Sequence, residues 1–258
     1  MIPLVDIHCH LLAAVDDGPR TDDEALAMCR AAYADGTRWA CATAHQNESW
    51  GDVTPDRLRQ ATRRLTQMLD QAGVPLTVFP GAEVLVRPDI EAAWRRGELL
   101  SLADRGQYLL IEMPHDVAID LGPVVEDLRR AGAGVVLAHP ERHPELLHDP
   151  GRVDRLAVAG CLVQVSARSI TDPPSRRAEQ VLKSWLRRGV VHLLGSDGHS
   201  LHRRPPRMAA AYRQIVRWAG SRVADRVCST NGTAILHGWP VRPAPPEPRK
   251  RRWLRLFG

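Results

Sequence analysis

Histidines and carboxylates end most of the apolar runs along this chain. The first run ends in Asp6-Ile-His8-Cys-His10, and the last leads into Asp197-Gly-His199. Four of the runs between them each end in a single residue of this kind: His45, Glu83, Glu112 and His139. Imidazole and carboxylate groups together suit Mn²⁺, Fe or Zn²⁺ as ligands. The pattern therefore predicts a site for divalent cations.

Each of these signals is weak when it is taken alone. A pair of histidines at a strand end is often solvated, and a single carboxylate there often caps a helix or faces water. Their joint placement on six of seven predicted strands is hard to obtain by chance, the exception being the run that ends in Gln164-Val-Ser166. Glu83 and Glu112 also lie inside apolar runs, where an unpaired carboxylate is costly to bury without a cation.

The elements that must position these residues alternate between short apolar runs and longer amphipathic stretches. This alternation is typical of βα units around a parallel sheet. The predicted strands cover residues 4–8, 39–44, 76–84, 108–113, 134–139, 161–166 and 190–196. The predicted helices cover residues 22–35, 55–72, 88–97, 120–132, 151–159, 175–188 and 206–219. The architecture is therefore a barrel or a doubly wound sheet.

The alternation of side chains along a strand predicts which of these residues meet. Because the period is two, His8 and His10 point to the same side and Cys9 points away. The same holds for Asp197 and His199 if the strand continues that far. Side chains at the carboxyl ends of parallel barrel strands converge on one face, which is where such folds place their active sites.

Length and charge indicate one domain and a tail. The chain has 258 residues, of which 44% are hydrophobic, enough for one substantial core. We expect a domain over residues 1–239 and a Pro-rich, basic tail over residues 240–258. The tail holds six basic residues and one acid, so it accounts for the whole net charge of +5. The rest of the chain is therefore not expected to bind nucleic acid.

The sequence also indicates the cellular compartment and the role of the cysteines. The sequence shows no signal-peptide pattern and no apolar run of about 18 residues, so we expect a cytoplasmic protein. The tail combines its cations with Trp253 and Phe257, and it is either a solubilising end or an anchor to anionic lipid at the inner face of the membrane. The five cysteines are scattered without CxxC spacing, and most are expected in the core.

These residues resemble the polymerase and histidinol phosphatase (PHP) superfamily. Within it, the chain is similar to the bacterial PHP-type protein-tyrosine phosphatases of capsule and exopolysaccharide operons. The resemblance runs nearly from end to end. It depends on Asp6-Ile-His-Cys-His10, Asp16-Asp-Gly18, Ala42-Thr-Ala-His45, Gly81-Ala-Glu83, Leu110-Ile-Glu112, Ala138-His-Pro-Glu-Arg142, Gly195-Ser-Asp-Gly-His199 and Arg204-Pro-Pro206.

The resemblance implies a distorted (β/α)7 TIM-like barrel of the PHP type. It also implies three divalent ions, usually Mn²⁺, with Fe, Zn²⁺ or Mg²⁺ as alternatives. The implied ligands are, for the first ion, His8, His10, Glu83 and Asp197; for the second, Glu83, Glu112 and His139; and for the third, Asp17, His45 and His199. The implied catalytic residues are Arg142 and Arg204, which would grip the phosphoryl oxygens, together with Asp197 and His199.

The implied reaction is hydrolysis of phosphotyrosine on a protein, expected to be a membrane-associated bacterial tyrosine kinase of capsule or exopolysaccharide synthesis. We expect in-line attack by hydroxide that the cations activate, without a covalent phosphoenzyme. The alternative is a PHP-type phosphatase of a small phosphomonoester such as histidinol phosphate. The Asp16-Asp-Gly18 loop and the compact length match the tyrosine phosphatase branch better.

Three other classes match less well. Cysteine-dependent tyrosine phosphatases need an arginine six positions after the nucleophilic cysteine, and no cysteine here has one. Two-metal amidohydrolases typically bridge their ions with a modified lysine, whereas the only lysines are Lys183, in a predicted helix, and Lys250, in the tail. The complete ligand set argues against a catalytically dead scaffolding module.

Two further details concern the surroundings of the expected ligands. Some relatives have a second histidine directly after the one at position 45, and this chain has Gln46 there, which affects bonding behind the ligands. Of the histidines outside the pattern, His143 and His202 are expected nearest the substrate. The others are placed at the surface or behind the ligands: His115, His148, His192 and His237.

Overall fold

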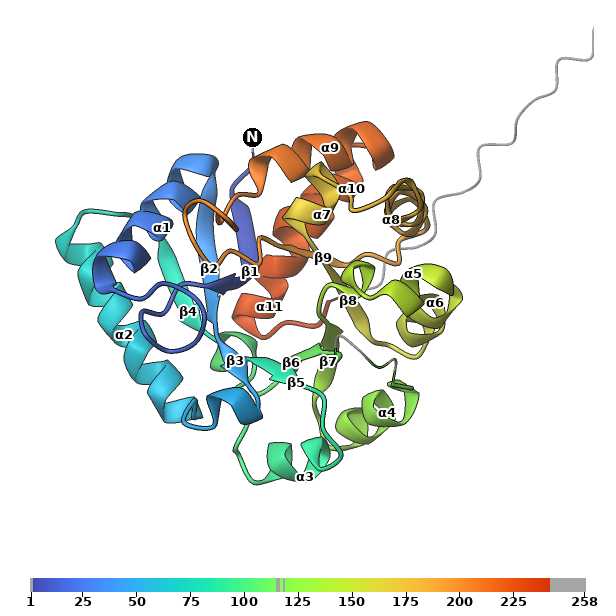
Figure 1. Ribbon diagram of the computed structural model, residues 1–258, viewed down its shortest axis with the longest axis horizontal. Helices are drawn as coiled ribbons and strands as arrows, with labels where there is room; N and C mark the ends of the chain where they lie inside the picture. Colours follow the sequence, from blue (N-terminus) through green and yellow to red (C-terminus); the bar gives the residue numbers. More distant parts are fainter. Residues whose placement is uncertain (1, 115–116, 118, 242–258) are drawn as a thin grey trace, which may run out of the picture.

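Helices surround a curled parallel sheet in the computed structural model, which describes residues 2–114, 117 and 119–241 (Figure 1). Within these residues there are nine strands: β1 (Leu4–His10), β2 (Thr37–Thr43), β3 (His45–Gln46), β4 (Thr77–Pro80), β5 (Glu83–Leu85), β6 (Tyr108–Glu112), β7 (Gly134–Leu137), β8 (Leu162–Ser166) and β9 (Leu193–Gly195). The predicted α/β architecture is confirmed. His115 and tail residues 242–258 lie outside the described residues.

The strands form two hydrogen-bonded sheets that join into one ring. Their orders are β1-β2-β4 and β3-β5-β6-β7-β8-β9, with every pair parallel. The sheets meet where the Glu83 N–H donates to the Ala44 carbonyl at 2.9 Å, and again where the His10 N–H donates to the Gly198 carbonyl at 2.9 Å. If β2 is counted with β3 and β4 with β5, seven strand positions surround one interior. This arrangement is a distorted barrel.

The nine strands exceed the seven predicted ones because one predicted strand is divided and another is followed by an additional short strand. The predicted strand over 76–84 breaks between β4 and β5, because Pro80 has no N–H to donate and Gly81 approaches another strand closely. A Cβ at Gly81 would lie 2.5 Å from the Cys41 sulfur. The predicted strand over 39–44 corresponds to β2, and the short strand β3 follows directly after that range. The chain therefore bends at this corner and carries β3 and β5 into the second sheet.

β1 changes the face that it presents to the interior part-way along its length. Its pairing register with β2 shifts by one residue between Asp6 and Cys9. Before the shift, Ile7 packs in the interior apolar cluster. After it, His8 and His10 face one another in the interior, while Cys9 packs in the other cluster, against the helices. This β-bulge lets the two histidines follow inward-facing apolar residues on the same strand.

The helices cover the outside of the ring and one of its ends. Their bounds are α1 (Asp22–Asp35), α2 (Pro55–Gln71), α3 (Ile90–Arg95), α4 (Gly122–Arg130), α5 (Pro144–His148), α6 (Gly151–Val158), α7 (Ala167–Thr171), α8 (Arg176–Arg188), α9 (Ala209–Ala219), α10 (Ser221–Asp225) and α11 (Asn231–His237), with a π-helical turn η4 (Arg226–Thr230) and three 3-10 turns, η1 (Glu48–Trp50), η2 (Leu102–Asp104) and η3 (Pro140–Arg142). α1 begins after Thr21, whose hydroxyl accepts from the Glu24 N–H at 3.2 Å, and it ends before Gly36 at φ 112°, as the sequence predicts. Among the described residues, no helix has the length and apolar character needed to cross a membrane.

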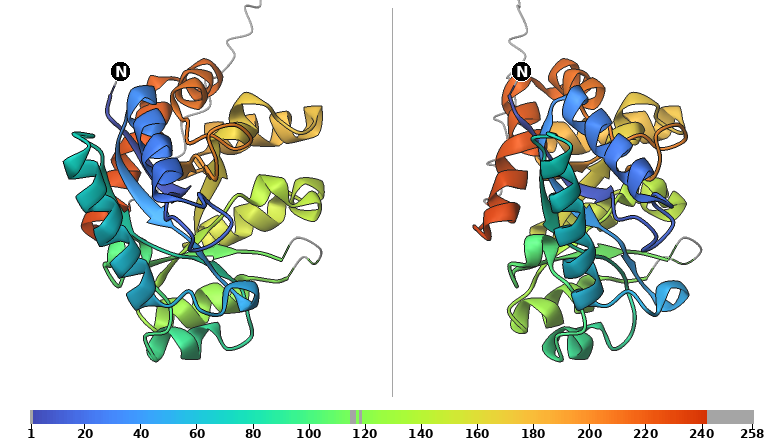
Figure 2. Two further views of the ribbon diagram at one scale, coloured as in Figure 1. Left: turned by 60° about the vertical axis from the view of Figure 1, so that its left-hand side comes forward. Right: turned by 90° about the vertical axis from the view of Figure 1, so that its left-hand side faces the viewer.

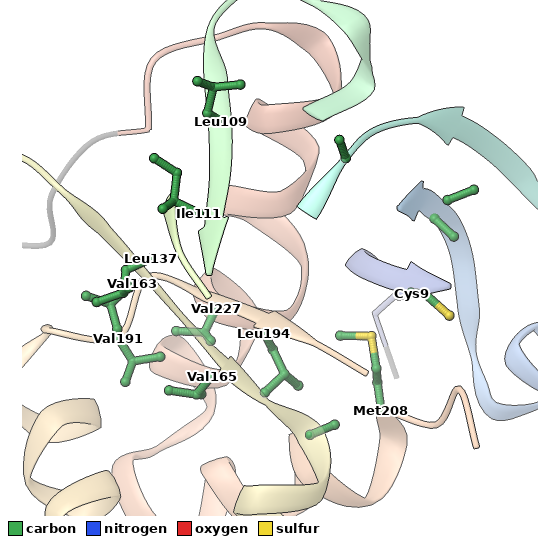
Figure 3. Packing of buried hydrophobic residues seen from close by; sticks show 14 of the residues in the cluster. Cys9, Leu109, Ile111, Leu137, Val163, Val165, Val191, Leu194, Met208 and Val227 are labelled. Atoms are coloured by element: carbon green, nitrogen blue, oxygen red, sulfur yellow. The ribbon is translucent and has the colours of Figure 1, made fainter. Parts of the chain in front are cut away.

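Apolar side chains fill two clusters, one on each side of the strand wall. The interior cluster includes Val5, Leu110 and Val136, and α11 closes it from one end of the ring, where it is drawn in red (Figure 2). The helix packs very close to β1 at Gly232, where a Cβ atom would lie only 2.8 Å from Val5. The outer cluster lies between strands and helices (Figure 3). All five cysteines are buried and free, as predicted for most of them.

Candidate metal centre

All nine predicted metal ligands converge in one cluster. Four overlapping groups place their donor atoms within 4.8 Å of one another: His8, His10 and Asp197; His8, Glu83 and His139; His45, Glu83 and Glu112; and His10, Asp17, His45 and His199. The groups share His8, His10, His45 and Glu83, so they form one continuous cluster. The register of β3 with β5 contributes directly, because it sets His45 beside Glu83.

Glu83 lies at the centre of this cluster. Its Oε2 atom is 3.1 Å from His8 Nε2, 3.3 Å from His10 Nε2 and 3.2 Å from His45 Nδ1. Its Oε1 atom is 2.9 Å from His139 Nε2. Burial raises the pKa of the Glu83 carboxyl, but the surrounding imidazoles outweigh burial and hold this pKa well below its usual range. Glu83 is therefore an ionised carboxylate that contacts four of the predicted histidine ligands.

The orientation of two histidines fits a cation between them. His8 Nδ1 lies 3.1 Å from Gln164 Oε1, which only accepts, so this contact requires the His8 proton on Nδ1. His10 Nδ1 lies 2.6 Å from Asp16 Oδ2, which favours its proton on Nδ1 in the same way. The two Nε2 atoms then face each other at 3.2 Å, where either a shared proton or a cation can lie between them. This is the orientation that metal-bound histidines take, with the opposite ring nitrogen donating to a carboxylate or carbonyl group.

Buried polar atoms without partners support the same interpretation. Glu83 Oε2, Asp197 Oδ1, His45 Nδ1 and His199 Nε2 have no hydrogen-bond partner among the described residues. Burial and the neighbouring charge of Glu83 also raise the pKa of Glu112 to about 7. Each unmet buried group costs about 1–3 kcal/mol, and divalent cations would satisfy donors of this type. The residues present therefore fit a centre of several cations.

Three polar residues behind the ligands hold them in place. Gln164 Oε1 also accepts from the His139 N–H at 3.3 Å. Asp16 Oδ2 also accepts from the His45 N–H at 3.0 Å. Asp6 Oδ1 accepts from the Ser196 N–H at 2.9 Å and so joins β1 to the turn after β9. The sequence interpretation set Gln164 aside as the exception and gave Asp16 and Asp6 no role. The sequence held one indication of the role of Gln164. It lies between Leu162 and Ser166 on the inward face of a buried strand, where a polar side chain needs a partner.

Two ligands take backbone conformations that strands do not allow. β7 ends at Leu137 and β9 at Gly195, so His139 and Asp197 lie beyond them. Their φ angles are 29° and 54°, in the left-handed region that costs a non-glycine residue of order 1–3 kcal/mol. Strand alternation is expected to carry Asp197 and His199 to one side if the strand continues that far. The strand ends before both residues, so this condition is not met. A left-handed turn brings both side chains to the site instead.

Two arginines meet one ligand at the edge of the cluster. Arg142, in η3, places Nη1 2.5 Å from Asp197 Oδ2, and Arg204 binds the same oxygen. Burial raises the pKa of the Asp197 carboxyl, but His8, His139 and Arg204 lower it more, so that it lies well below its usual value. The two arginines predicted to bind phosphate thus lie together beside the cluster of predicted ligands.

The remaining predicted ligands form the more exposed side of the cluster. The side chain of Asp17 is 51% exposed, and its Oδ1 atom lies 3.5 Å from His45 Nε2 and 3.4 Å from His199 Nε2. Burial lowers the pKa of His45 to about 4 and also lowers that of His199. Both imidazoles are therefore neutral near pH 7, as a metal ligand must be.

Other histidines and Gln46 lie away from the donors. His192 is buried in the core, where its Nδ1 accepts from the Val163 N–H at 3.0 Å, so its placement at the surface or behind the ligands is wrong. Gln46 donates to the Val53 carbonyl at 2.9 Å and accepts from the Leu100 N–H at 2.9 Å. It ties neighbouring loops together and does not bond to the ligands.

Two hollows open on either side of Arg204. The larger is about 700 Å³ and includes Arg142, Ser166 and Asp197 in its lining. The smaller is about 560 Å³ and includes Asp17, His199 and His202. His202 thus lines this hollow together with two of the predicted ligands, and its approach to the substrate stays a prediction. His143 is buried beside His139 and Arg142, and both of its ring nitrogens lack a partner among the described residues.

Comparison with known proteins decides the family. The family model described as "Capsular polysaccharide synthesis, CpsB/CapC" matches residues 4–237. The chain belongs to this family. This CpsB/CapC sequence is 30% identical to tyrosine-protein phosphatase YwqE of Bacillus subtilis over 256 residues, covering 99% of each chain. It is 26% identical to tyrosine-protein phosphatase CpsB of Streptococcus pneumoniae over 239 residues, covering 90% of this chain and 98% of that one.

A solved structure from the CpsB/CapC family matches the fold of this chain. It was described with the words "YwqE from Bacillus subtilis and CpsB from Streptococcus pneumoniae, unique metal-dependent tyrosine phosphatases". It matches this chain with a TM-score of 0.88 at 29% identity, covering 96% of this chain and 100% of that one. The predicted resemblance and fold class are thereby confirmed.

Proposed function

We propose that this CpsB/CapC chain is a metal-dependent tyrosine-protein phosphatase. One observation supports it above the others: Arg142 and Arg204 converge on Asp197 Oδ2 at the rim of a cluster of unpaired metal-ligand atoms. Planar guanidinium groups bind phosphoryl oxygens in a bidentate way. A phosphate group can therefore be held between two arginines and the cation centre at once.

We further propose three divalent ions, with Mn²⁺ as the resident metal. The ligands would be those expected from the sequence, with Glu83 shared by the first and second ions, and His10 close enough to reach the third group as well. When bound, such ions lower the pKa of water and stabilise charge on the attacking and leaving oxygens. The donor atoms are all oxygen or nitrogen, which suits Mn²⁺, Fe or Zn²⁺. They include no thiolate, so a structural zinc site held by cysteines is excluded.

The protein's own residues would bind and orient the ester. Arg142 and Arg204 would exchange their shared contact with Asp197 for the phosphoryl oxygens, and Asp197 would then be released to serve as a metal ligand. Gln164 and Asp16 keep the His8 and His10 protons on Nδ1, away from the reacting group. Tyrosine leaves as a fairly stable phenolate, so no strong general acid is needed.

The substrate we propose is phosphotyrosine on a membrane-associated bacterial tyrosine kinase of capsule or exopolysaccharide synthesis. The family description and the names of the relatives support this assignment. The two open hollows beside Arg204 also leave space for polypeptide on both sides of a phosphotyrosine. We propose that the enzyme works in the cytoplasm, at the inner face of the membrane.

A substrate comparison tests the function. Purified protein should hydrolyse p-nitrophenyl phosphate and a phosphotyrosine peptide, with a higher kcat/KM for the peptide than for histidinol phosphate. Arg142→Lys and Arg204→Lys should each lose about 10²–10³-fold in kcat/KM, because lysine cannot replace the bidentate contact. Arg63→Lys, on the outer face of α2, is the matched control. A clear preference for histidinol phosphate would make the small-molecule alternative correct.

The tail gives a separate test of membrane association. Deleting residues 242–258 should leave hydrolysis of p-nitrophenyl phosphate unchanged and reduce sedimentation with vesicles that contain anionic lipid. Vesicles of neutral lipid are the control. Equal sedimentation of the full chain and the shortened chain would rule out the tail as an anchor.

A further inference from the structure

The larger hollow beside the metal centre is a groove rich in arginine. Five arginines line it: Arg142, Arg168, Arg203, Arg204 and Arg207. They come from three separate elements, because Arg142 belongs to η3, Arg168 to α7, and the others to the loop between β9 and α9. The groove therefore begins at the phosphate-binding pair and continues outward along further cations.

The outer arginines of the groove hold no carboxylate. Arg168, Arg203 and Arg207 form no ion pair within the described part of the chain. Some arginines elsewhere on the surface do have carboxylate partners: Arg59 lies 2.8 Å from Asp104, and Arg188 lies 2.8 Å from Asp154. Unpaired cations gathered in one concave surface raise the local concentration of anions there.

The lining carboxylates do not cancel this charge. Only Asp172 and Asp197 line the groove among the acidic residues of the described chain, and Asp197 is already bound by two arginines. Arg168 is oriented by a hydrogen bond from Nη1 to the Arg203 carbonyl at 3.2 Å. Along the floor, the buried Ser166 hydroxyl lacks a partner among the described residues. The groove thus combines positive charge with a free polar group.

The hollow on the other side of Arg204 has a different balance. Asp17 and Glu24 line it together with Arg20, Arg203 and Arg204. Its two carboxylates offset most of its charge, whereas the groove keeps an excess of cations. The two sides of the metal centre are therefore electrostatically unequal.

We propose that the groove binds acidic side chains that flank the phosphotyrosine of the protein substrate on one side. This inference rests on the proposed phosphatase function and names the substrate class that the site prefers. Carboxylates of such a segment would pair with Arg168 and Arg207 while the phosphate occupies Arg142 and Arg204. A concave groove that starts at the phosphate-binding pair fits a continuous chain better than a flat anionic surface.

The test compares flanking charge on the two sides of a phosphotyrosine. Three peptides of equal length carry three glutamates before the phosphotyrosine, three after it, or glutamines in both places. One glutamate peptide should exceed the glutamine peptide by roughly 3- to 10-fold in kcat/KM, and the gain should shrink as salt is raised. The double variant Arg168→Gln/Arg207→Gln should lose this gain and keep its kcat/KM for p-nitrophenyl phosphate and for the glutamine peptide.

The control separates the groove from the overall charge. Arg20→Gln removes a cation from the other hollow, and it should keep the gain in full. Equal kcat/KM for the three peptides, or a gain that survives in the double variant, would overturn the proposal. An equal loss in Arg20→Gln would also overturn it, because steering by total charge would then explain the preference. If no peptide is hydrolysed at all, the phosphatase function itself fails.

Discussion

His8 Nε2 and His10 Nε2 lie 3.2 Å apart, with the two rings turned so that these nitrogens face each other. Gln164 and Asp16 cause this orientation, because each takes the Nδ1 side of one imidazole. Two facing acceptors repel unless a proton or a cation lies between them. The orientation of the histidines is therefore prepared by residues that do not touch the cations themselves.

We predict that Gln164→Leu weakens metal binding without unfolding the barrel. Without the amide oxygen, the His8 ring is free to change tautomer and to turn, and loss of such a partner costs about 10–100-fold in metal affinity. The measurement is a competition titration with a fluorescent chelator, together with activity as a function of Mn²⁺ concentration. High Mn²⁺ should restore much of the activity. Gln164→Glu keeps an acceptor at this place and should retain most of the affinity, and equal affinities for the two variants would disprove the positioning role.

We predict that Glu83→Gln lowers the number of bound ions and the turnover together. The substitution keeps the shape of the side chain but removes the negative charge that three imidazole nitrogens face at 3.1–3.3 Å. Turnover should fall by about 10²-fold or more, since stabilisation of charge at such sites is worth that much. Elemental analysis gives the ion content. Glu98→Gln, on the surface, is the control, and an unchanged ion content in Glu83→Gln would show that Glu83 is not the shared ligand.

Removal of the ions should abolish activity and lower the melting temperature. Metal binds the folded cluster and not the unfolded chain, so saturation at 100 times Kd adds about 2.7 kcal/mol to stability. Dialysis against a chelator should give an inactive protein with its far-UV circular dichroism unchanged. Mn²⁺ should restore activity and melting temperature in parallel. Full activity after verified removal of all divalent ions would contradict the metal-dependent mechanism.

We predict that His192 makes stability depend on pH in acid. Burial and the nearby Arg226 lower its pKa to about 4 in the folded protein, against about 6.5 in the unfolded chain. The unfolded chain therefore binds the proton first as pH falls. The free energy of unfolding keeps its highest value above pH 6.5 and decreases between pH 6.5 and 4. The difference amounts to about 3 kcal/mol.

His192→Asn isolates this effect, because it removes the titrating ring and keeps an acceptor for the Val163 N–H. Denaturant unfolding of both metal-free proteins at pH 7, 5.5 and 4 measures it. The stability advantage of the wild type over the variant should shrink toward pH 4. His148→Asn, at an exposed site, should show no such trend, and an advantage of His192 that is constant with pH would disprove the assignment.

The ligand types and their placement at strand ends could be predicted from the sequence. Backbone geometry makes side chains alternate along a strand, and parallel strands bring their carboxyl ends to one edge. These are local rules, so Glu112 could be placed at the end of its strand before any contact was known, whereas His45 and Glu83 begin β3 and β5 in the structure. The phosphate-binding Arg142 and Arg204 could also be named, but only through the resemblance to a family.

The contacts between distant segments could not be predicted in this way. The bulge in β1 depends on its register with β2, and the position of Gln164 beside His8 depends on two strands that are 156 residues apart in sequence. Asp197 reaches the site through a left-handed turn and not through strand alternation.

The sequence by itself determined the chemistry of the centre, because donor type and strand-end position are properties of short segments. Only the tertiary structure decided which ring nitrogens face inward, which arginines share Asp197 and which remain unpaired in the groove. The physical reason is that hydrogen bonds and ion pairs form over a few ångströms. Their partners here come from strands and loops that only closure of the ring brings together.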